Sequence, residues 1–201
     1  MDHAASDAAR SPTQAPRPTI VVLGDSLSAG YGLPPNTGWV TLLTQRLTDH
    51  PAGKNHYTVV NSSISGDTTS GGRSRLPGAL ARSHPAVVIV ELGANDALRG
   101  LPMSVTQSNL EAIIEMSQAA GAKVVLVGMQ IPPNYGPSYT QAFSSLFPTL
   151  AKRYHTALVP FLLQGIADKP EMFQADQMHP LATAQPVLLD NVWAPLSPLL
   201  Q

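Results

Sequence analysis

Short apolar segments alternate with segments of helical spacing along most of this chain. Residues with strand preference fill five segments: 19–23, 57–61, 86–92, 123–128 and 157–159. The segment 86–92 is nearly unbroken apolar, which is typical of a strand covered on both faces in a parallel sheet. Apolar residues at helical spacing predict helices over 39–47, 69–83, from Ser104 or Thr106 to Ala120, over 138–154, and after Pro180. This alternation predicts an α/β fold, a three-layer α/β/α sandwich around a five-stranded, mostly parallel sheet with right-handed crossovers.

The length of 201 residues is that of one domain, which we expect to span residues 19–201. Hydrophobic residues make up 43% of the chain and charged residues only 12%, so there is ample material for one core. Residues 1–18 are rich in Ala, Ser and Pro and lack the apolar segment of a signal peptide. We expect them to form a flexible N-terminal tail.

The charge, the apolar runs and the lack of cysteine exclude several kinds of partner and site. The formal net charge is −1 and there is no run of Lys or Arg, so we expect no nucleic-acid partner. No apolar run approaches the ~20 residues that span a bilayer, so we expect no stable membrane insertion. The absence of cysteine excludes disulfides, thiolate metal sites and a cysteine nucleophile. No His-Glu-x-x-His motif is present either, and we expect no metal site.

The first candidate for chemistry is Ser26, which follows the first predicted strand in a Gly-Asp-Ser turn. In open α/β sheets ligands bind at the carboxyl edge, where the loops that leave the strands converge. A serine hydroxyl needs a base within hydrogen-bond reach and a group that orients this base. Of the six histidines, His179 lies on the loop before the last helix, with Asp176 three positions earlier. A carboxylate so placed can bond one ring nitrogen and leave the other facing Ser26.

Acyl transfer also needs donors for the oxyanion of the tetrahedral intermediate. Gly66 follows the second strand and exposes its backbone N–H, and Asn95 follows the third strand with an amide donor. The alternative is that Gly66 only provides a turn conformation and that Asn95 only caps its loop. For the neighbouring acids Asp25, Asp67 and Asp96 we expect a scaffolding role as acceptors of loop N–H groups, and the same for Glu91.

Apolar residues on loops at the same sheet edge are candidates for the wall of an acyl groove, with ordinary core packing as the alternative. They are Leu101, Met103, Ile131, Pro132, Phe173 and Met178.

Four blocks, in this order, make the chain resemble an SGNH hydrolase of the GDSL type, in the bacterial group of thioesterase I, lysophospholipase L1 and arylesterase. The blocks are Gly24-Asp25-Ser26-Leu27-Ser28-Ala29-Gly30-Tyr31-Gly32, Asn61-Ser62-Ser63-Ile64-Ser65-Gly66-Asp67-Thr68, Glu91-Leu92-Gly93-Ala94-Asn95-Asp96 and Asp176-Gln177-Met178-His179-Pro180. The likeness runs from about Thr19 to the C-terminus. Two departures, Ala94 in place of a frequent glycine and the Gln177-Met178 pair, bear on the acyl-chain preference.

The resemblance implies a role for each matched residue. Ser26 is then the nucleophile, His179 the base and Asp176 its orienter, and the backbone of Ser26 with Gly66 and Asn95 forms the oxyanion hole. It further implies that residues 97–108 form a lid, and we expect substrate contacts from Leu101, Pro102, Ile131, Pro132 and Met178. Similar proteins act without metal or organic cofactor, so we expect none.

The expected function is a serine esterase and thioesterase that forms an acyl-enzyme from lysophospholipids, acyl-CoA, and aryl or short-chain esters. Similar proteins are exported to the bacterial periplasm, so we expect a periplasmic or secreted monomer whose partner is a small acyl ester or thioester. One alternative is a carbohydrate O-acetylesterase, and another is a noncatalytic flavodoxin-like binding module. Covalent labelling by a fluorophosphonate separates the enzyme from the binding module.

Overall fold

The computed structural model of the protein describes residues 16–50 and 56–200. Most of the predicted N-terminal tail, up to residue 15, lies outside the described residues. Its last residue, Pro18, already belongs to the fold, because its carbonyl accepts the N–H of Thr58 at 2.9 Å. The extent of the single domain stays a prediction.

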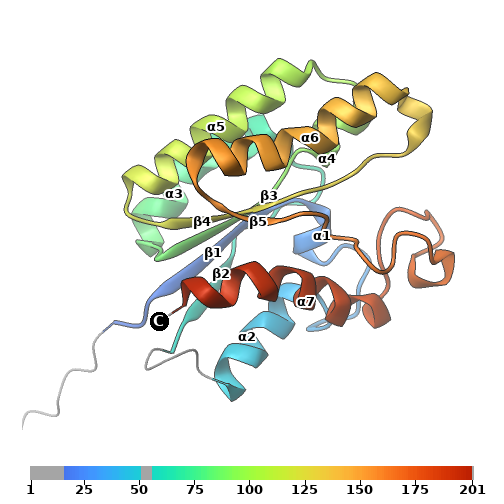
Figure 1. The fold of residues 1–201 in the computed structure, drawn as a ribbon. Helices are drawn as coiled ribbons and strands as arrows, with labels where there is room; N and C mark the ends of the chain where they lie inside the picture. Colours follow the sequence, from blue (N-terminus) through green and yellow to red (C-terminus); the bar gives the residue numbers. More distant parts are fainter. Residues whose placement is uncertain (1–15, 51–55, 201) are drawn as a thin grey trace, which may run out of the picture.

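A five-stranded sheet forms the middle layer (Figure 1). The strands are β1 (Thr19–Gly24), β2 (Thr58–Asn61), β3 (Val87–Glu91), β4 (Lys123–Val127) and β5 (Ala157–Val159). Their order is β2-β1-β3-β4-β5, and all four neighbouring pairs are parallel. The predicted parallel sheet and its five strands are therefore confirmed, with ends that differ by at most one residue.

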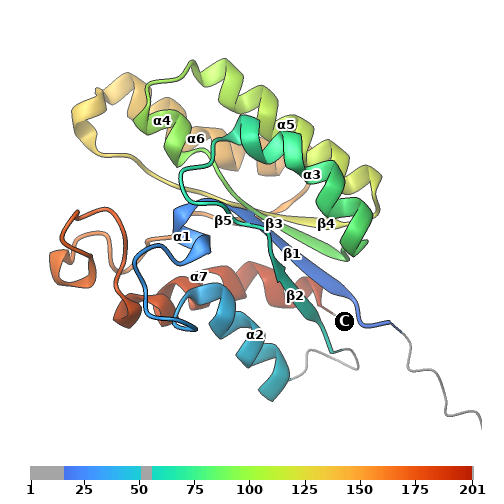
Figure 2. The same ribbon diagram turned by 180° about the vertical axis from the view of Figure 1, so that it is seen from behind.

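Helices cover both faces of the sheet (Figures 1 and 2). On one face lie α2 (Trp39–Asp49) and α7 (Gln185–Leu196), and on the other lie α3 (Thr69–Ser83), α5 (Met103–Ala119) and α6 (Pro137–Tyr154). Alternate strand residues feed the two layers: Ile20 and Val22 join the core under α2 and α7, whereas Leu23 joins the opposite core. Because helices cover both faces of the sheet, the strands are apolar almost without interruption.

Two short helices were not expected from the sequence. The helix α1 (Ser26–Ala29) begins at Ser26, and α4 (Ala94–Leu98) contains Asn95. The helix α5 begins at Met103, earlier than Ser104 or Thr106, behind Pro102 and without a side-chain cap. The segment 97–108, predicted as a lid, therefore consists mostly of helix ends, and only residues 99–102 connect them.

A long connection between β5 and α7 lies beyond the carboxyl ends of the strands, beside α1 (Figures 1 and 2). It contains only the 3-10 turns η2 (Pro170–Met172) and η3 (Ala182–Ala184). This segment carries Asp176 and His179. None of the helices in the described part of the chain is both long and apolar enough to cross a membrane.

Candidate active site

Ser26 is held at the junction of the interior strand β1 and the helix α1. The carboxylate of Asp25 caps this helix, because its Oδ1 accepts the N–H of Leu27 at 3.0 Å. The helix ends after one turn at Gly30, whose φ of +78° is the left-handed conformation that glycine adopts without cost. The hydroxyl of Ser26 thus stands at the first position of a helix, on the carboxyl edge of the sheet.

The structure brings the three residues of the predicted triad into contact. The Nε2 atom of His179 lies 2.9 Å from the Oγ of Ser26, although 153 residues separate the two along the chain. The Nδ1 atom of the same ring lies 2.6 Å from Oδ2 of Asp176. A neutral imidazole with its proton on Nδ1 leaves Nε2 as the acceptor for the serine hydroxyl.

Local hydrogen bonds stabilise the ionised form of the Asp176 carboxylate. Its Oδ1 accepts the N–H groups of Met178 at 2.9 Å and of His179 at 3.0 Å. These bonds and the contact with the imidazole lower the pKa of Asp176 to about 2. Asp176 is therefore ionised at neutral pH and can stabilise an imidazolium beside it.

Gln174 joins the loop that carries His179 to Tyr31, in the segment that follows α1. Its backbone N–H donates to the carbonyl of His179 at 2.7 Å, next to an isolated bridge between Phe173 and Pro180. Its side-chain Nε2 donates to the carbonyl of Tyr31 at 2.8 Å. Because no regular strand or helix holds this loop, these bonds fix the position of the imidazole relative to the serine.

The ring of Tyr31 covers one side of the His179 imidazole. The two ring centroids are 4.5 Å apart, with an angle of 42° between the ring planes. The tyrosine side chain is 52% exposed. An aromatic ring at this distance limits the orientations that the imidazole can adopt.

The predicted donors of the oxyanion hole are the backbone N–H groups of Ser26 and Gly66 and the side-chain amide of Asn95. No other described residue accepts the N–H of Ser26 or of Gly66, and Gly66 sits in a turn with φ of +81°. The amide nitrogen of Asn95 donates to Oδ2 of Asp25 at 3.1 Å and to the carbonyl of Asp67 at 2.9 Å. A substrate oxyanion at Asn95 would therefore take over one of these two bonds.

The acids next to these donors scaffold their loops, as predicted. Asp25, Asp67 and Asp96 each accept a backbone N–H, from Leu27, Thr68 and Thr69 respectively. Glu91 accepts the N–H of Asp25 at 3.4 Å and the hydroxyl of Ser28 at 2.7 Å.

Comparison with known proteins decides the family of the chain. The family model described as the GDSL-like lipase/acylhydrolase family matches residues 22–185. The chain belongs to this family. Esterase TesA of Pseudomonas aeruginosa is 51% identical over 187 residues, which cover 93% of this chain and 92% of TesA. A crystal structure titled TesA superposes with a TM-score of 0.86 at 51% identity, over 90% of this chain and 99% of that one.

Two further proteins are similar to this chain over most of its length. Thioesterase 1/protease 1/lysophospholipase L1 of Escherichia coli is 40% identical over 90% of this chain and 84% of its own length. The psychrotrophic esterase EstA from Pseudoalteromonas sp., solved in a form inhibited by monoethylphosphonate, has a TM-score of 0.83 at 40% identity. That match covers 90% of this chain and 97% of EstA.

The residues predicted to contact substrate lie on three loops of this GDSL-like hydrolase. Leu101 and Pro102 connect α4 to α5, Pro132 follows β4, and Met178 precedes His179. Met178 is 49% exposed, whereas the carbonyl of Leu101 is held by the hydroxyl of Tyr139 at 2.8 Å. Ile131 departs from the expectation: it is 6% exposed and packs in the core under α5 and α6, so it offers almost no surface to a substrate.

Three residues of the site were not anticipated from the sequence. Tyr31 lies in the first block, but nothing in the local pattern reveals its contact with His179. Gln174 precedes the fourth block and shows no pattern at all. Arg75 lies in the second turn of α3 and bridges Asp67, at 2.7 Å, to the carbonyls of Gly24 and Ser62.

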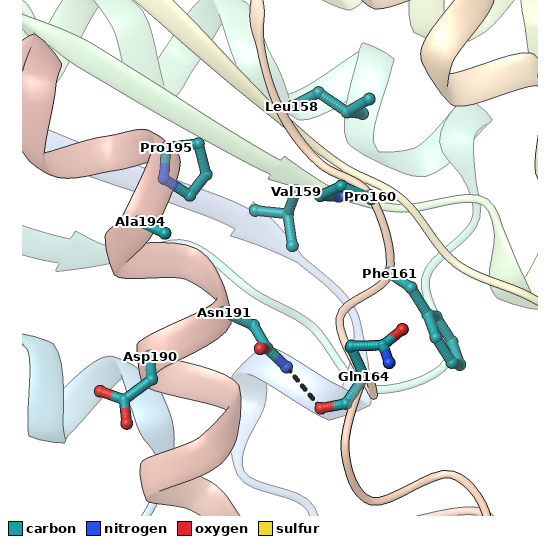
Figure 3. Close-up of a pocket in the computed structure, with 9 residues that line it drawn as sticks. All are labelled: Leu158, Val159, Pro160, Phe161, Gln164, Asp190, Asn191, Ala194 and Pro195. Atoms are coloured by element: carbon teal, nitrogen blue, oxygen red, sulfur yellow. Dashed lines mark hydrogen bonds between the residues drawn. The ribbon is translucent and has the colours of Figure 1, made fainter.

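The described residues offer no metal site, and the groove between β5 and α7 lies apart from the triad. Within 16–50 and 56–200, no cluster of three or more His, Asp or Glu could hold a metal ion. A groove of about 570 Å³ lies between β5 and α7 (Figure 3). It contains none of the predicted site residues, and its one acid, Asp190, is bound by Arg46 at 2.7 Å. Its lining consists of Leu158, Val159, Pro160, Phe161, Gln164, Asp190, Asn191, Ala194 and Pro195.

Proposed function

We propose that this member of the GDSL-like family is a serine ester and thioester hydrolase that works through an acyl-enzyme on Ser26. The observation that carries the proposal is the continuous contact from the Ser26 hydroxyl through the His179 imidazole to the Asp176 carboxylate. The names of the relatives, which include an esterase and a thioesterase/lysophospholipase, support the same reaction class.

The first half of the reaction forms the acyl-enzyme. The Oγ of Ser26 attacks the substrate carbonyl while Nε2 of His179 takes the hydroxyl proton, and ionised Asp176 stabilises the resulting imidazolium. The developing oxyanion accepts the N–H groups of Ser26 and Gly66 and one amide hydrogen of Asn95. As the intermediate collapses, His179 returns the proton to the departing alcohol or thiol.

The second half releases the acid. Water attacks the acyl-Ser26 ester, His179 removes one of its protons, and the same donors hold the second oxyanion. An oxygen ester and a thioester with the same acyl group pass through the same acyl-enzyme. Where deacylation limits turnover, the two substrates should share one kcat.

The exposed surface around the triad favours apolar acyl or aryl groups. Three of the loops that carry site residues each present one large apolar side chain: Tyr31 at 52% exposure, Ile64 at 53% and Met178 at 49%. Leu101, Pro102 and Pro132 extend the candidate surface on two further loops. We therefore propose lysophospholipids, acyl-CoA, and aryl and short-chain esters as substrates rather than acetylated carbohydrates.

Labelling with a fluorophosphonate probe tests the nucleophile. The unmodified protein should bind one probe per chain, and Ser26→Ala should bind none and lose turnover of p-nitrophenyl esters. Ser65→Ala is the matched control, because Ser65 is exposed on the Gly66 loop and should not affect labelling. Labelling that survives in Ser26→Ala, or no labelling of the unmodified protein, contradicts the proposal.

A substrate series tests the substrate class. Acyl groups from two to sixteen carbons are offered as paired p-nitrophenyl esters and CoA thioesters, beside a lysophospholipid and acetylated xylan. The proposal predicts turnover of both the ester and the thioester series. Preference for acetylated xylan over all of these would instead favour the carbohydrate esterase.

We further propose that the protein acts as a periplasmic or secreted monomer. The likeness of its four sequence blocks to exported bacterial enzymes supports the location. Fluorophosphonate labelling of separated cell fractions tests the compartment, and light scattering on a gel-filtration peak tests the oligomeric state. A labelled band confined to the cytosol, or a dimer mass, would contradict the respective statement.

A further inference from the structure

A buried pair of carboxyl groups lies directly beneath the nucleophile. Asp25 is 1% exposed and Glu91 is 2% exposed. They sit side by side because β1 and β3 are in register, with Gly24 opposite Glu91. The Asp25 N–H points to Oε2 of Glu91 at 3.4 Å, so the carboxyl group of Glu91 lies directly beside Asp25.

No cation among the described residues forms an ion pair with either carboxyl group. The titratable and charged groups that face the pair are His179 from the last loop, Asp67 from the loop after β2, and Arg75 from α3. Arg75 is engaged by Asp67 and by two backbone carbonyls, and Asp67 adds a further negative charge. Two ionised carboxylates in contact in a buried, uncompensated site are strongly unfavourable, so the pair must retain one proton.

The hydrogen bonds around the pair indicate which group is the anion. Both oxygens of Asp25 accept donors, Oδ1 from the N–H of Leu27 and Oδ2 from the amide of Asn95. In Glu91, Oε2 accepts the hydroxyl of Ser28 at 2.7 Å, and no donor from the described residues reaches Oε1. The carboxylate oxygens of Asp25 thus both accept hydrogen bonds, whereas a protonated Glu91 can donate one hydrogen bond to Asp25.

We propose that Glu91 is a positioning residue of the active site, which stays protonated at neutral pH and donates its proton to ionised Asp25. Asp25 in turn caps α1 beneath Ser26 and orients the Asn95 amide. Burial beside a second carboxyl raises the pKa of Glu91 well above its usual value, and burial raises the pKa of Asp25 to about 6. Both directions agree with one shared proton at pH 7.

Infrared spectroscopy tests the protonation directly. The difference spectrum between the unmodified protein and Glu91→Gln at pH 7 should contain the carbonyl band of a protonated carboxylic acid, carried by the unmodified protein. Glu111→Gln is the control, because Glu111 is paired with Arg153 at 2.8 Å and should contribute no such band. If Glu91→Gln does not fold, carboxyl ¹³C shifts of glutamate in the unmodified protein give the same information. A Glu91 signal that is fully ionised at pH 7 overturns the proposal.

The stability of the protein gives a second readout, with a definite sign. A carboxyl whose folded-state pKa is raised stabilises the fold below its unfolded pKa of about 4.3, and this contribution is lost as pH rises through the folded-state value. The urea midpoint of the unmodified protein should therefore fall relative to that of Glu91→Gln between pH 4 and pH 8. Parallel midpoints across this range overturn the proposal.

Kinetics separate positioning from a merely structural role. This arm rests on the proposed esterase function. Glu91→Ala should lower kcat about tenfold with KM little changed, because it disturbs donors that act on the developing oxyanion. Glu91→Gln, which still offers a neutral donor, should recover most of that kcat. An equal loss in both variants, or a loss confined to KM, contradicts the positioning role.

The two proposals fail in different ways. If Ser26→Ala keeps the infrared band and the unmodified protein hydrolyses no ester, the shared proton stands without the esterase. If ester hydrolysis is present and the band is absent, only the role of Glu91 fails.

Discussion

The two halves of the active site are built in opposite ways. Ser26 follows the interior strand β1 and stands on buried supports, Asp25 at 1% exposure and Glu91 at 2%. His179 comes from a 25-residue connection, 160–184, whose only regular elements are two 3-10 turns. Its partner Asp176 has a side chain that is 39% exposed. The half with Ser26 rests on the buried core, whereas the half with His179 is a loop that packs against it.

This difference determines what each half contributes. The buried half cannot relax, so a change there leaves polar groups without partners, and water does not easily replace them. The loop half must be ordered against its conformational entropy by a few bonds, chiefly those of Gln174 and Asp176. Water can replace part of what an exposed group provides. Substitutions in the two halves should therefore differ in size and in the parameter they change.

The largest expected effect is the loss of the base itself. His179→Ala should lower kcat/KM for p-nitrophenyl esters by about 10⁴-fold or more, because the serine proton then has no acceptor. Asp176→Asn should cost only about 10²-fold, since its exposed position lets water supply part of the lost charge stabilisation. Steady-state kinetics at pH 7 measures both. Equal losses of kcat/KM in the two variants would show that the carboxylate of Asp176, although exposed, is as important for catalysis as the imidazole of His179.

The next effect concerns the buried half. Asn95→Ala should lower kcat by about 10²–10³-fold with a small change in KM, as expected for a donor that acts on the oxyanion. Asn134→Ala is the control, because Asn134 is exposed on the connection between β4 and α6. The comparison is made with one substrate under saturating conditions. A loss in KM alone would indicate that Asn95 only binds the ground state or caps its loop.

The smallest expected effect tests the bonds that hold the loop. Gln174→Ala removes the side-chain bond to the Tyr31 carbonyl, so the imidazole should be less well placed and kcat should fall about tenfold. The free energy of unfolding should fall by only about 1 kcal/mol, because the lost bond is partly exposed. Urea denaturation and kinetics of the same preparation measure the two quantities. A large loss of stability without loss of kcat would mean that Gln174 serves the fold rather than the site.

Much of the fold could be predicted from local sequence, and particular exceptions show where prediction ends. The strand β3 could be predicted because residues 86–92 are apolar apart from Glu91, and α3 was predicted with its exact bounds despite Pro77. The helices α1 and α4 could not, since four or five residues do not form a stable helix alone. They exist because Asp25 caps one and because β1 and β3 deliver both to the same edge. Ile131 lies in a segment whose prolines predict a loop, and only its packing against α5 and α6 places it in the core.

The amino-acid sequence alone determined the order of strands and helices, the parallel sheet, and which serine, histidine and aspartate are candidates for chemistry. It could do so because apolar periodicity and short motifs are local properties of the chain. Only the tertiary structure decided that Nε2 of His179 lies beside Ser26, that Tyr31 and Gln174 support this contact, and that Glu91 shares a buried site with Asp25. These contacts join residues up to 153 positions apart, and burial, which sets their charge states, exists only once the layers have packed.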